Sequence, residues 1–516
     1  MEKLMTKWPA AVAALLSAIP ILVAIVLPRH LNDDAYITLN YATNLAEGRG
    51  FVFNHGPASF GTTTPLFTLL MAGFHWVLPG VPLDAAAKFF SAICTSTLPW
   101  ILILWRRLWR LSLVDAVIVS AVLILFANYI ALGMEAYLFQ FLLLLTCACF
   151  FAKRYWAAGV LTGLLALTRG EGILLAGVIP VWLLAAHRKT FISTPGNVIV
   201  PLLKMATGGT IAILPWTMYA YMTFGRVLPN TLGAKLAQIA NGSPQFETML
   251  IVRLTEWGSY TPGLPWLTWI YHLLALSGLL CLIRFRHPLL LPVLWALVYT
   301  AAYASLPIPF YWWYEFPAYN GWLLCIGVSL AAVMRWARAQ RVAGRSWPGA
   351  GGRVFVVAIV LCMAVQCVSE TVRYQGYKKT DAYLAVCGWF EANTDPEDVI
   401  AASEVGYFGY FLPNPILDLW GLTTPSNVPY VEAGKPDEGL WANAADYYVG
   451  FDNDPAWEFL HKSARFQANF SAVATMPYDT RWGRCVIYKR DEPAPAAVGQ
   501  GAIQRPAAQA HVGQPR

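Results

Sequence analysis

The sequence predicts an all-α polytopic membrane domain of about eleven helices, followed by a small C-terminal α/β domain. Of its 516 residues, 57% are hydrophobic and only 13% are charged, whereas soluble domains carry roughly 25% charged residues. Apolar runs recur at about the 20-residue length that a membrane-spanning helix needs. Residues 371–490 hold 15 acidic and 10 basic residues, while the rest holds 14 acidic and 26 basic. This asymmetry predicts an acidic soluble domain beside basic membrane loops, with no nucleic-acid partner.

Eleven apolar segments form the predicted membrane domain. They are residues 9–28, 83–105, 112–131, 135–152, 155–169, 171–187, 197–222, 265–283, 288–307, 316–335 and 353–370. The first follows Lys3 and Lys7 as a secretory signal would. It is long, has no clear small-residue cleavage site and precedes many further spans, so it is predicted to be a retained helix.

A twelfth apolar stretch, 62–79, is assigned by charge. If it does not cross and the N-terminus is cytoplasmic, every basic cluster falls on the cytoplasmic side, as the positive-inside rule requires. These clusters include Arg106–Arg107–Arg110, Lys153–Arg154, Arg188–Lys189, Arg284–Arg286 and the arginines between 335 and 353. The stretch is therefore predicted to be an interfacial or re-entrant helix in an outer loop spanning 29–82. Its start, Thr62-Thr63-Thr64-Pro65, suits a helix N-terminus.

The predicted membrane domain covers 1–370, and the extracytoplasmic domain covers 371–490. The latter contains a helical pattern and several short strand patterns. They are the helix Thr380–Asn393 and the strands Val399–Ala402, Ile416–Leu419, Phe470–Ala474 and Cys485–Lys489. Whether Cys387 and Cys485 pair is left open. Residues 491–516 are rich in Ala, Pro, Gly and Gln and are predicted to be a disordered tail.

The pair Asp33–Asp34 is the first candidate for chemistry. Two adjacent carboxylates at the end of a membrane span require solvation, a partner or a function. An Asp in a dry, outward-facing pocket can remove the proton from a hydroxyl that attacks a sugar carbon. The second Asp can raise the first one's proton affinity or help to hold a divalent cation. Taken alone, however, the pair is more simply explained as a solvated helix start.

A series of motifs in a fixed order favours a catalytic role for the pair over a simple helix start. The first loop holds Asp-Asp-Ala-Tyr, Tyr-Ala-Thr-Asn-Leu-Ala, Gly-Arg-Gly and Gly-Thr-Thr-Thr-Pro-Leu, and later segments continue the series. The positions are Asp33–Tyr36, Tyr41–Ala46, Gly48–Gly50, Gly61–Leu66, Gly133–Glu135, Thr168–Gly172, Leu228–Thr231 and Asp418–Leu422. Over residues 30–425 the series resembles the GT-C glycosyltransferases, most of all the bacterial arabinofuranosyltransferases of the mycobacterial cell-wall type. Gly170 departs from the proline usual in that pattern.

The resemblance implies roles for the matched residues. Asp33 would be the general base, and Asp34 would orient it or the acceptor. Arg169 and Lys235 would stabilise the charge that develops on the phosphate leaving group. Glu135 and Glu171 would bind sugar hydroxyls or pair with Arg169. Further substrate-binding candidates are Tyr36, His55, Asn230, Tyr314 and Glu315, with Arg226 behind the cationic pair.

The implied function is transfer of a sugar, D-arabinofuranose by the resemblance, from a polyprenyl-phosphate donor. The acceptor would be a hydroxyl of a glycan or protein outside a bacterial plasma membrane, with the C-terminal domain periplasmic. Two alternatives stay open within the fold: a mannosyl- or hexosyltransferase, and a lipid A-type aminosugar transferase. A polyprenyl-sugar flippase or transporter is a third, disfavoured because internal repeats and mid-span charges are lacking. No resident cofactor is implied beyond a divalent cation at Asp33–Asp34.

Overall fold

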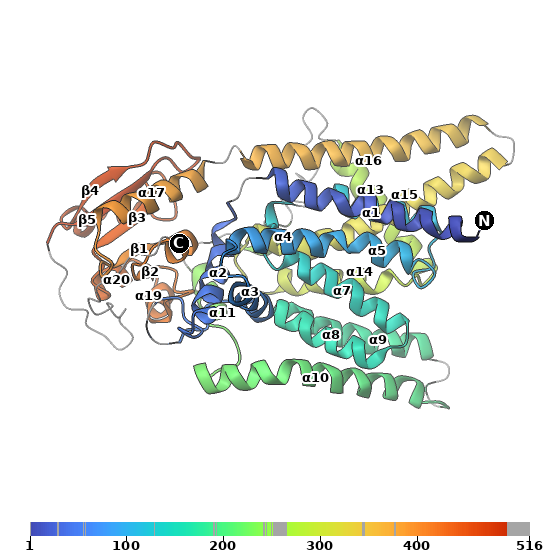
Figure 1. Cartoon of the computed structure of the whole chain (residues 1–516), viewed down its shortest axis with the longest axis horizontal. Coiled ribbons are helices and arrows are strands. Elements are labelled where there is room, and N and C mark those ends of the chain that lie inside the picture. Colours follow the sequence, from blue (N-terminus) through green and yellow to red (C-terminus); the bar gives the residue numbers. More distant parts are fainter. Residues whose placement is uncertain are drawn as a thin grey trace. The chain divides into compact units, whose positions relative to one another are not determined.

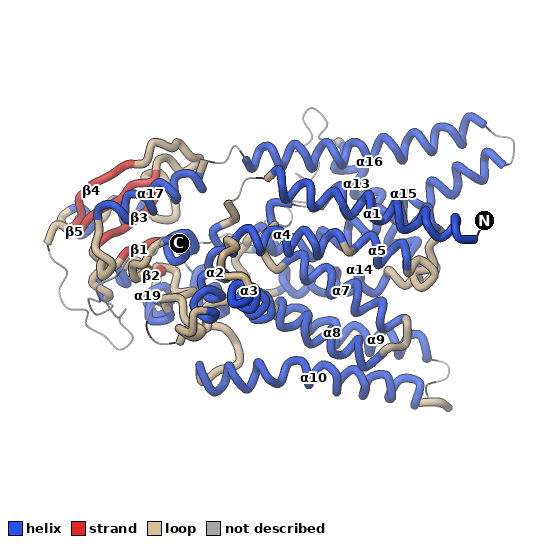
Figure 2. The backbone as a smooth tube through the Cα atoms, in the orientation of Figure 1, coloured by secondary structure: helices blue, strands red, loops and turns tan. Residues whose placement is uncertain are grey.

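The computed structural model describes residues 2–492, apart from 28–29, 55, 57, 128, 189–190, 192, 241–242, 244, 249, 251–265, 343–345 and 376–377. The chain forms two compact units. The first comprises Met1–Arg29, Ala85–Thr217 and Pro244–Gln375, and the second comprises His30–Asp84, Met218–Ser243 and Gly376–Arg516. The helices and strands of both units can be followed in Figures 1 and 2. Each unit is described by itself.

The first unit is a bundle of apolar helices. They are α1 Glu2–Val26, α4 Leu83–Ser96, α5 Leu98–Leu104, α6 Leu113–Leu125, α7 Ala136–Phe151, α8 Tyr155–Thr168, α9 Leu174–His187, α10 Gly196–Phe224, α13 Leu267–Arg284, α14 Leu290–Ser305, α15 Phe316–Val342 and α16 Ser346–Gln375. Seven spans within the described residues are long and apolar enough to cross a membrane. Each of the eleven predicted segments corresponds to one helix or to the pair α4–α5, so the predicted polytopic membrane fold is confirmed.

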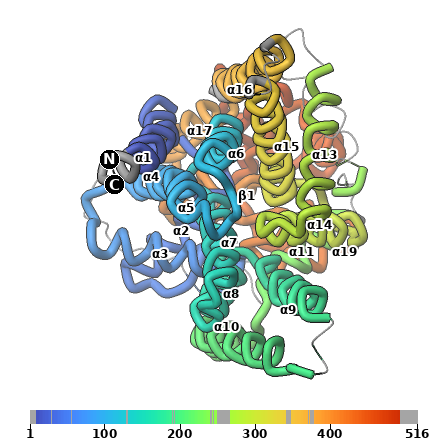
Figure 3. Tube along the Cα trace, turned by 90° about the vertical axis from the view of Figure 1, so that its right-hand side faces the viewer, coloured from blue at the N-terminus to red at the C-terminus, as the bar shows by residue number. Residues whose placement is uncertain are grey.

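Glycines bring several of these helices close together. A Cβ on Gly278 of α13 would lie 1.9 Å from the carbonyl oxygen of Cys325 in α15. A Cβ on Gly159 of α8 would lie 2.1 Å from the carbonyl oxygen of Met205 in α10. Small residues permit such backbone approach between membrane helices, where lipid provides no hydrophobic force for association. Figure 3 shows the bundle end-on, with α15 among α6, α13, α14 and α16, all of which it contacts.

The second unit begins with the first loop. Helix α2, Asp33–Ala46, starts where the Asn32 side chain accepts a hydrogen bond from the Asp34 N–H at 3.4 Å. The two aspartates in its first turn suit the positive end of the helix dipole. Helix α3, Pro65–Val77, packs on α2 and has 13 residues, fewer than a span needs. Its re-entrant placement stays a prediction.

The C-terminal part of this unit is a small α/β domain around a five-stranded sheet of order β2-β1-β3-β5-β4. The strands are β1 Ile400–Ala402, β2 Ile416–Asp418, β3 Tyr447–Phe451, β4 Phe470–Thr475 and β5 Cys485–Arg490. β2, β1 and β3 run parallel, whereas β5 is antiparallel to both β3 and β4. Four strands and the helix α17, Lys379–Asn393, match the predicted segments. β3 was not predicted, although its sequence Tyr-Tyr-Val-Gly-Phe is rich in residues that favour strands.

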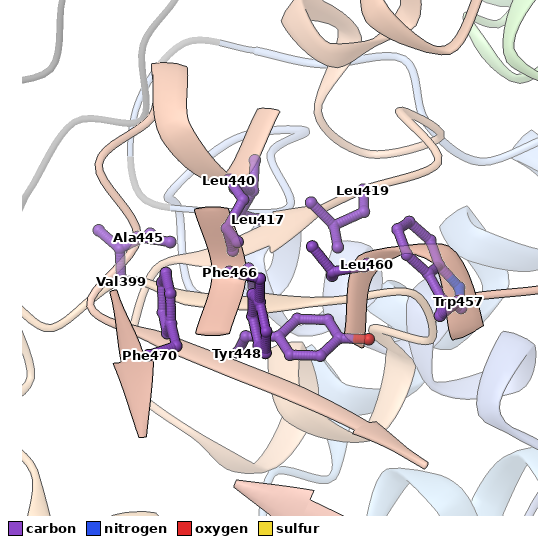
Figure 4. Close-up of a cluster of buried hydrophobic side chains, with 11 residues drawn as sticks. Val399, Leu417, Leu419, Leu440, Ala445, Tyr448, Trp457, Leu460, Phe466 and Phe470 are labelled. Carbon is purple, nitrogen blue, oxygen red and sulfur yellow. The ribbon is translucent and has the colours of Figure 1, made fainter. Parts of the chain in front are cut away.

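The remaining helices of the domain are short. They are α18 Gly406–Phe411, α19 Val428–Glu432, α20 Glu438–Ala442, α21 Glu458–His461 and α22 Ala464–Gln467, with α11 Thr231–Ala240 packed against α19. The domain has its own hydrophobic core, drawn in Figure 4, in which Leu417, Tyr448, Trp457 and Phe466 are almost fully buried. Cys387 and Cys485, whose pairing the sequence left open, are both buried free thiols.

Helix α18 packs against α2 through two glycines. A Cβ on Gly406 would lie 1.8 Å from the carbonyl oxygen of Asp33, and one on Gly409 would lie 2.4 Å from the Phe53 ring. The backbone of Asp33 cannot move aside as a flexible side chain could. Absence of a side chain at Gly406 is therefore a condition for the contact between the first loop and the C-terminal domain.

We expect Gly406→Ala to destabilise the protein by about 1–3 kcal/mol, the usual cost of overpacking a well-packed contact. The measurement is the thermal unfolding midpoint of the full chain in detergent. Gly388→Ala in α17 is the matched control, because a Cβ there meets nothing within 4 Å. Alanine favours a helix over glycine, so that midpoint should stay constant or rise. Equal midpoints for both variants would contradict this account of the α2–α18 contact.

Candidate active site

The residues singled out in the sequence fall into two groups, one in each unit. The first surrounds the acidic pair at the start of α2. Asp33 Oδ2 accepts a hydrogen bond from the Gly406 N–H at 3.0 Å, and Asp33 Oδ1 accepts one from the Tyr407 N–H at 2.9 Å. Both carboxylate oxygens are therefore held by the first two amides of α18. The Tyr407 hydroxyl adds a bond to the Leu31 carbonyl at 2.7 Å.

Asp34 has a different environment. No side chain or amide within the described ranges donates a hydrogen bond to its carboxylate, and Lys235 on α11 is the cation that lowers its pKa most. Burial raises the pKa of Asp34, the charge of Asp33 raises it further, and Lys235 opposes the shift. Burial likewise raises the pKa of Asp33, followed by the charge of Glu404, while the two α18 amides lower it. Both aspartates thus hold their protons to higher pH than an ordinary carboxyl group.

Three residues of the C-terminal domain adjoin the pair and were not singled out in the sequence. Glu404 follows β1 and accepts hydrogen bonds from Lys379 Nζ at one oxygen and from the Tyr383 hydroxyl, at 2.8 Å, at the other. Lys379 and Tyr383 stand four residues apart on α17, so they lie on one helix face. The spacing alone was visible in the sequence, but their proximity to Asp33 arises only from the contact of α18 with α2.

Several other predicted site residues make contacts that hold neighbouring segments together. Tyr36 is fully buried, its hydroxyl reaches Asp84 at 3.5 Å, and its ring packs against Tyr407. Asn230 precedes α11, where its N–H donates to the Phe60 carbonyl and its side chain accepts from Arg226 at 2.7 Å. Substrate roles for Tyr36 and Asn230 stay predictions. His55 lies outside the described residues.

The motif Asp418–Leu422 forms a turn after β2. Asp418 accepts hydrogen bonds from the N–H groups of Trp420, at 2.9 Å, and Thr423, at 2.8 Å, and Gly421 has a φ of +77°. A Cβ on Gly61 of the first loop would lie 2.8 Å from the Leu422 carbonyl. Two of the motifs found far apart in the sequence therefore lie in contact with each other.

The second group lies in the membrane bundle around Arg169. Its Nη1 donates to Glu135 at 2.9 Å and its Nη2 contacts Glu171 at 3.4 Å. Arg169 and Glu135 are about 95% buried. Glu135 and Glu171 were predicted either to bind sugar hydroxyls or to pair with Arg169, and the structure shows the pairing. A triad of two carboxylates and one guanidinium carries a net negative charge, so the phosphate-binding role predicted for Arg169 stays a prediction that this pairing does not favour.

An aromatic face on α14 completes this second group. The Tyr303 hydroxyl donates to Glu171, the Trp295 indole N–H donates to the Glu171 carbonyl at 3.4 Å, and the Tyr299 hydroxyl donates to the Tyr314 carbonyl at 2.8 Å. Trp295, Tyr299 and Tyr303 recur at four-residue spacing, a signal that could have placed them on one helix face. The predicted Tyr314 places its ring 5.8 Å from the Arg169 guanidinium, and the predicted Glu315 is half-buried beside it.

The divalent cation that the resemblance allows at Asp33–Asp34 stays an expectation. Across the described part of the chain, no three His, Cys, Asp or Glu side chains are grouped as a metal site would require.

A hollow of about 530 Å³ lies at the amino ends of β1 and β3 in the C-terminal domain. It is lined by Asp395, Asp398, Asp446 and Lys489 among others. There Asp446 Oδ2 accepts from the Val399 N–H at 2.8 Å, so this carboxylate already fixes the start of β1. The hollow is remote in the sheet from the residues around Asp33.

Comparisons with known proteins agree with the fold. Residues 370–493 match a family model described as a domain of unknown function, DUF8728. No curated protein matches the sequence. Two crystal structures of ArnT from Cupriavidus metallidurans are similar over nearly the whole chain. The one bound to undecaprenyl phosphate is 13% identical with a TM-score of 0.57, covering 95% of this chain and 99% of that one. The apo structure is 13% identical with a TM-score of 0.58, covering 94% and 98%. This chain therefore shares its overall fold with ArnT, and its long apolar helices are those of a multi-pass membrane protein.

We expect Arg169→Gln to destabilise the bundle by about 3–5 kcal/mol, because it leaves two buried carboxylates without their cation. Adding Glu135→Gln should recover part of that loss, since it removes one uncompensated charge. Thermal unfolding in detergent measures both variants. A midpoint near that of the wild type for Arg169→Gln would show that the triad does not support the bundle and would favour a role in binding an anion.

Proposed function

We propose that this protein is a membrane glycosyltransferase that moves a sugar from a polyprenyl-phosphate donor to an acceptor hydroxyl outside a bacterial plasma membrane. The observation that carries the proposal is the partly buried acidic pair at the start of α2, with Asp33 held by the α18 amides and the charge of Lys235 acting on Asp34. The shared fold with ArnT, which has been crystallised with undecaprenyl phosphate, supports the lipid donor.

In the proposed reaction, the acceptor oxygen attacks the anomeric carbon of the sugar. The new oxygen–carbon bond forms as the bond from that carbon to the phosphate oxygen breaks, and the electron pair leaves with the polyprenyl phosphate. A carboxylate takes the acceptor's proton. A cation near the departing phosphate stabilises the charge that develops there. Lys235 is half-buried and suits that role better than Arg169, which is bound between two glutamates.

The contacts favour Asp34 over Asp33 as the base. The sequence resemblance implied the reverse. Both oxygens of Asp33 already accept backbone hydrogen bonds, which lowers the basicity of a carboxylate. Asp34 keeps both oxygens available among the described residues, and its raised proton affinity suits a group that must accept a proton near neutral pH. In this proposal Asp33 positions α2 and raises the proton affinity of Asp34.

The identity of the donor sugar has to be determined by experiment. D-Arabinofuranose is our first proposal because it is the sugar implied by the motif series. A mannosyl or hexosyl donor and a lipid A-type aminosugar donor are equally compatible with the fold. Purified protein should release prenyl phosphate from one member of a panel of prenyl-phosphate pentoses, hexoses and aminosugars, in step with glycosyl transfer. Passage of intact labelled donor across liposomes without such release would instead indicate a flippase.

We expect Asp34→Asn to lower the transfer rate by about 10²–10⁴-fold, the usual contribution of a general base. Asp33→Asn should have a smaller effect, since an asparagine can still accept one of the two α18 amides. The rates are measured with saturating donor and acceptor, and thermal unfolding confirms that both variants fold. If Asp33→Asn were the inactive variant and Asp34→Asn the active one, the roles proposed here would be reversed.

The rate of transfer should also depend on pH. A base must be deprotonated to act, so its activity rises as pH increases through its pKa. Burial and Asp33 raise the pKa of Asp34, so the midpoint of this rise should lie well above the value of about 4 typical of an exposed Asp. A profile of kcat/KM from pH 4 to pH 9 measures it. A rate that is already maximal at pH 5 would contradict the assignment.

A further inference from the structure

The carboxyl end of strand β1 in the C-terminal domain lies close to the acidic pair. Strands β2, β1 and β3 are parallel, and β1 lies between the other two. The chain leaves β1 toward β2 on one side and later returns to β3 on the other, so the strand order reverses at β1. In open α/β sheets, ligands bind outside the carboxyl ends of the strands at such a reversal. Glu404 lies at that position, two residues after β1 ends at Ala402.

The same short segment contacts the acidic pair. Gly406, whose amide binds Asp33 Oδ2, is only two residues beyond Glu404. Two residues of chain extend over at most about 7 Å. The charge of Glu404 accordingly influences both Asp33 and Asp34. A sugar hydroxyl bound at Glu404 would therefore lie close to the acidic pair.

Glu404 is held firmly while its carboxylate stays accessible. Its two oxygens accept hydrogen bonds from Lys379 and from Tyr383, and its side chain is nevertheless 40% exposed. Lys379 is only 12% exposed, and its ammonium lies 4.2 Å from the centre of the Trp482 ring. The cation is thus enclosed, whereas the anion faces outward. A carboxylate oriented by buried partners is pre-organised to accept further hydrogen bonds.

We propose that the C-terminal domain binds the acceptor glycan at the carboxyl edge of β1, where Glu404 accepts hydrogen bonds from its hydroxyl groups. This proposal rests on the proposed glycosyltransferase function and assigns a role to the domain of unknown function. Donor binding and cleavage are assigned elsewhere, to the acidic pair and Lys235. Acceptor binding and donor cleavage can therefore be measured separately in one experiment.

The test uses full-length protein in detergent, the donor that the wild type cleaves, and alkyl arabinosides and alkyl hexosides as acceptors. For Glu404→Gln, we expect the KM for the acceptor to rise about tenfold or more, the cost of weakening a charged hydrogen bond. Release of prenyl phosphate into water without acceptor, measured on the high-pH plateau where the acidic pair is already deprotonated, should stay within about twofold of the wild type. Glu438→Gln is the matched control, because Glu438 pairs with Arg465 on the surface of the same domain. Its acceptor KM should not change.

The outcomes distinguish the two proposals. An unchanged acceptor KM for Glu404→Gln, or an equal loss of donor cleavage and transfer, would overturn the acceptor site. Absence of donor cleavage by the wild type would overturn the glycosyltransferase function itself, and the acceptor site with it. If Glu404→Gln fails to fold, Tyr383→Phe decides. It removes one donor to Glu404 without changing the charge, and it should raise the acceptor KM several-fold while leaving donor cleavage intact.

Discussion

The carboxylate of Asp33 is the interaction on which the rest of the candidate site depends. It joins the first turn of α2 to the first turn of α18, and so ties the first loop to the C-terminal domain. Gly406 makes this bond sterically attainable, and the Tyr407 hydroxyl reinforces it at Leu31. Because Asp33 is fixed in this way, its neighbour Asp34 is held where the charge of Lys235 acts on it, and no described residue donates a hydrogen bond to its carboxylate.

A second pair of hydrogen bonds also links the first loop to the C-terminal domain. The Asn54 side chain forms two hydrogen bonds of 2.9 Å with the backbone of Ile416 in β2, one as donor and one as acceptor. Because β2 is the last strand on its side of the sheet, Asn54 pairs with backbone groups that an edge strand leaves open. Loop and domain thus form one compact unit, in which the loop residues serve both the packing of the domain and the proposed chemistry.

Much of the fold was predictable, because apolar length and charge placement are strong signals in a membrane protein. All eleven segments correspond to helices, and four strands of the sheet were found. β3 was missed, although its residues favour a strand. The pairing of Arg169 with Glu135 and Glu171 was anticipated as one of two readings, because the three charges lie near predicted helix ends. Glu404, Lys379 and Tyr383 were not, since their nearness to Asp33 depends on a tertiary contact that has no local pattern.

The bond from Asp33 to Tyr407 joins residues 374 positions apart, and this distance has a consequence for biosynthesis. Synthesis proceeds from the N-terminus, so the first loop is made long before the amides that bind it. Until residue 407 has been translated, Asp33 lacks the amides that bind it and the loop lacks its packing surface. A ribosome that stops early would therefore leave a chain with inserted helices but an unassembled centre. Folding of the C-terminal domain is then the step that assembles the contact between the two segments.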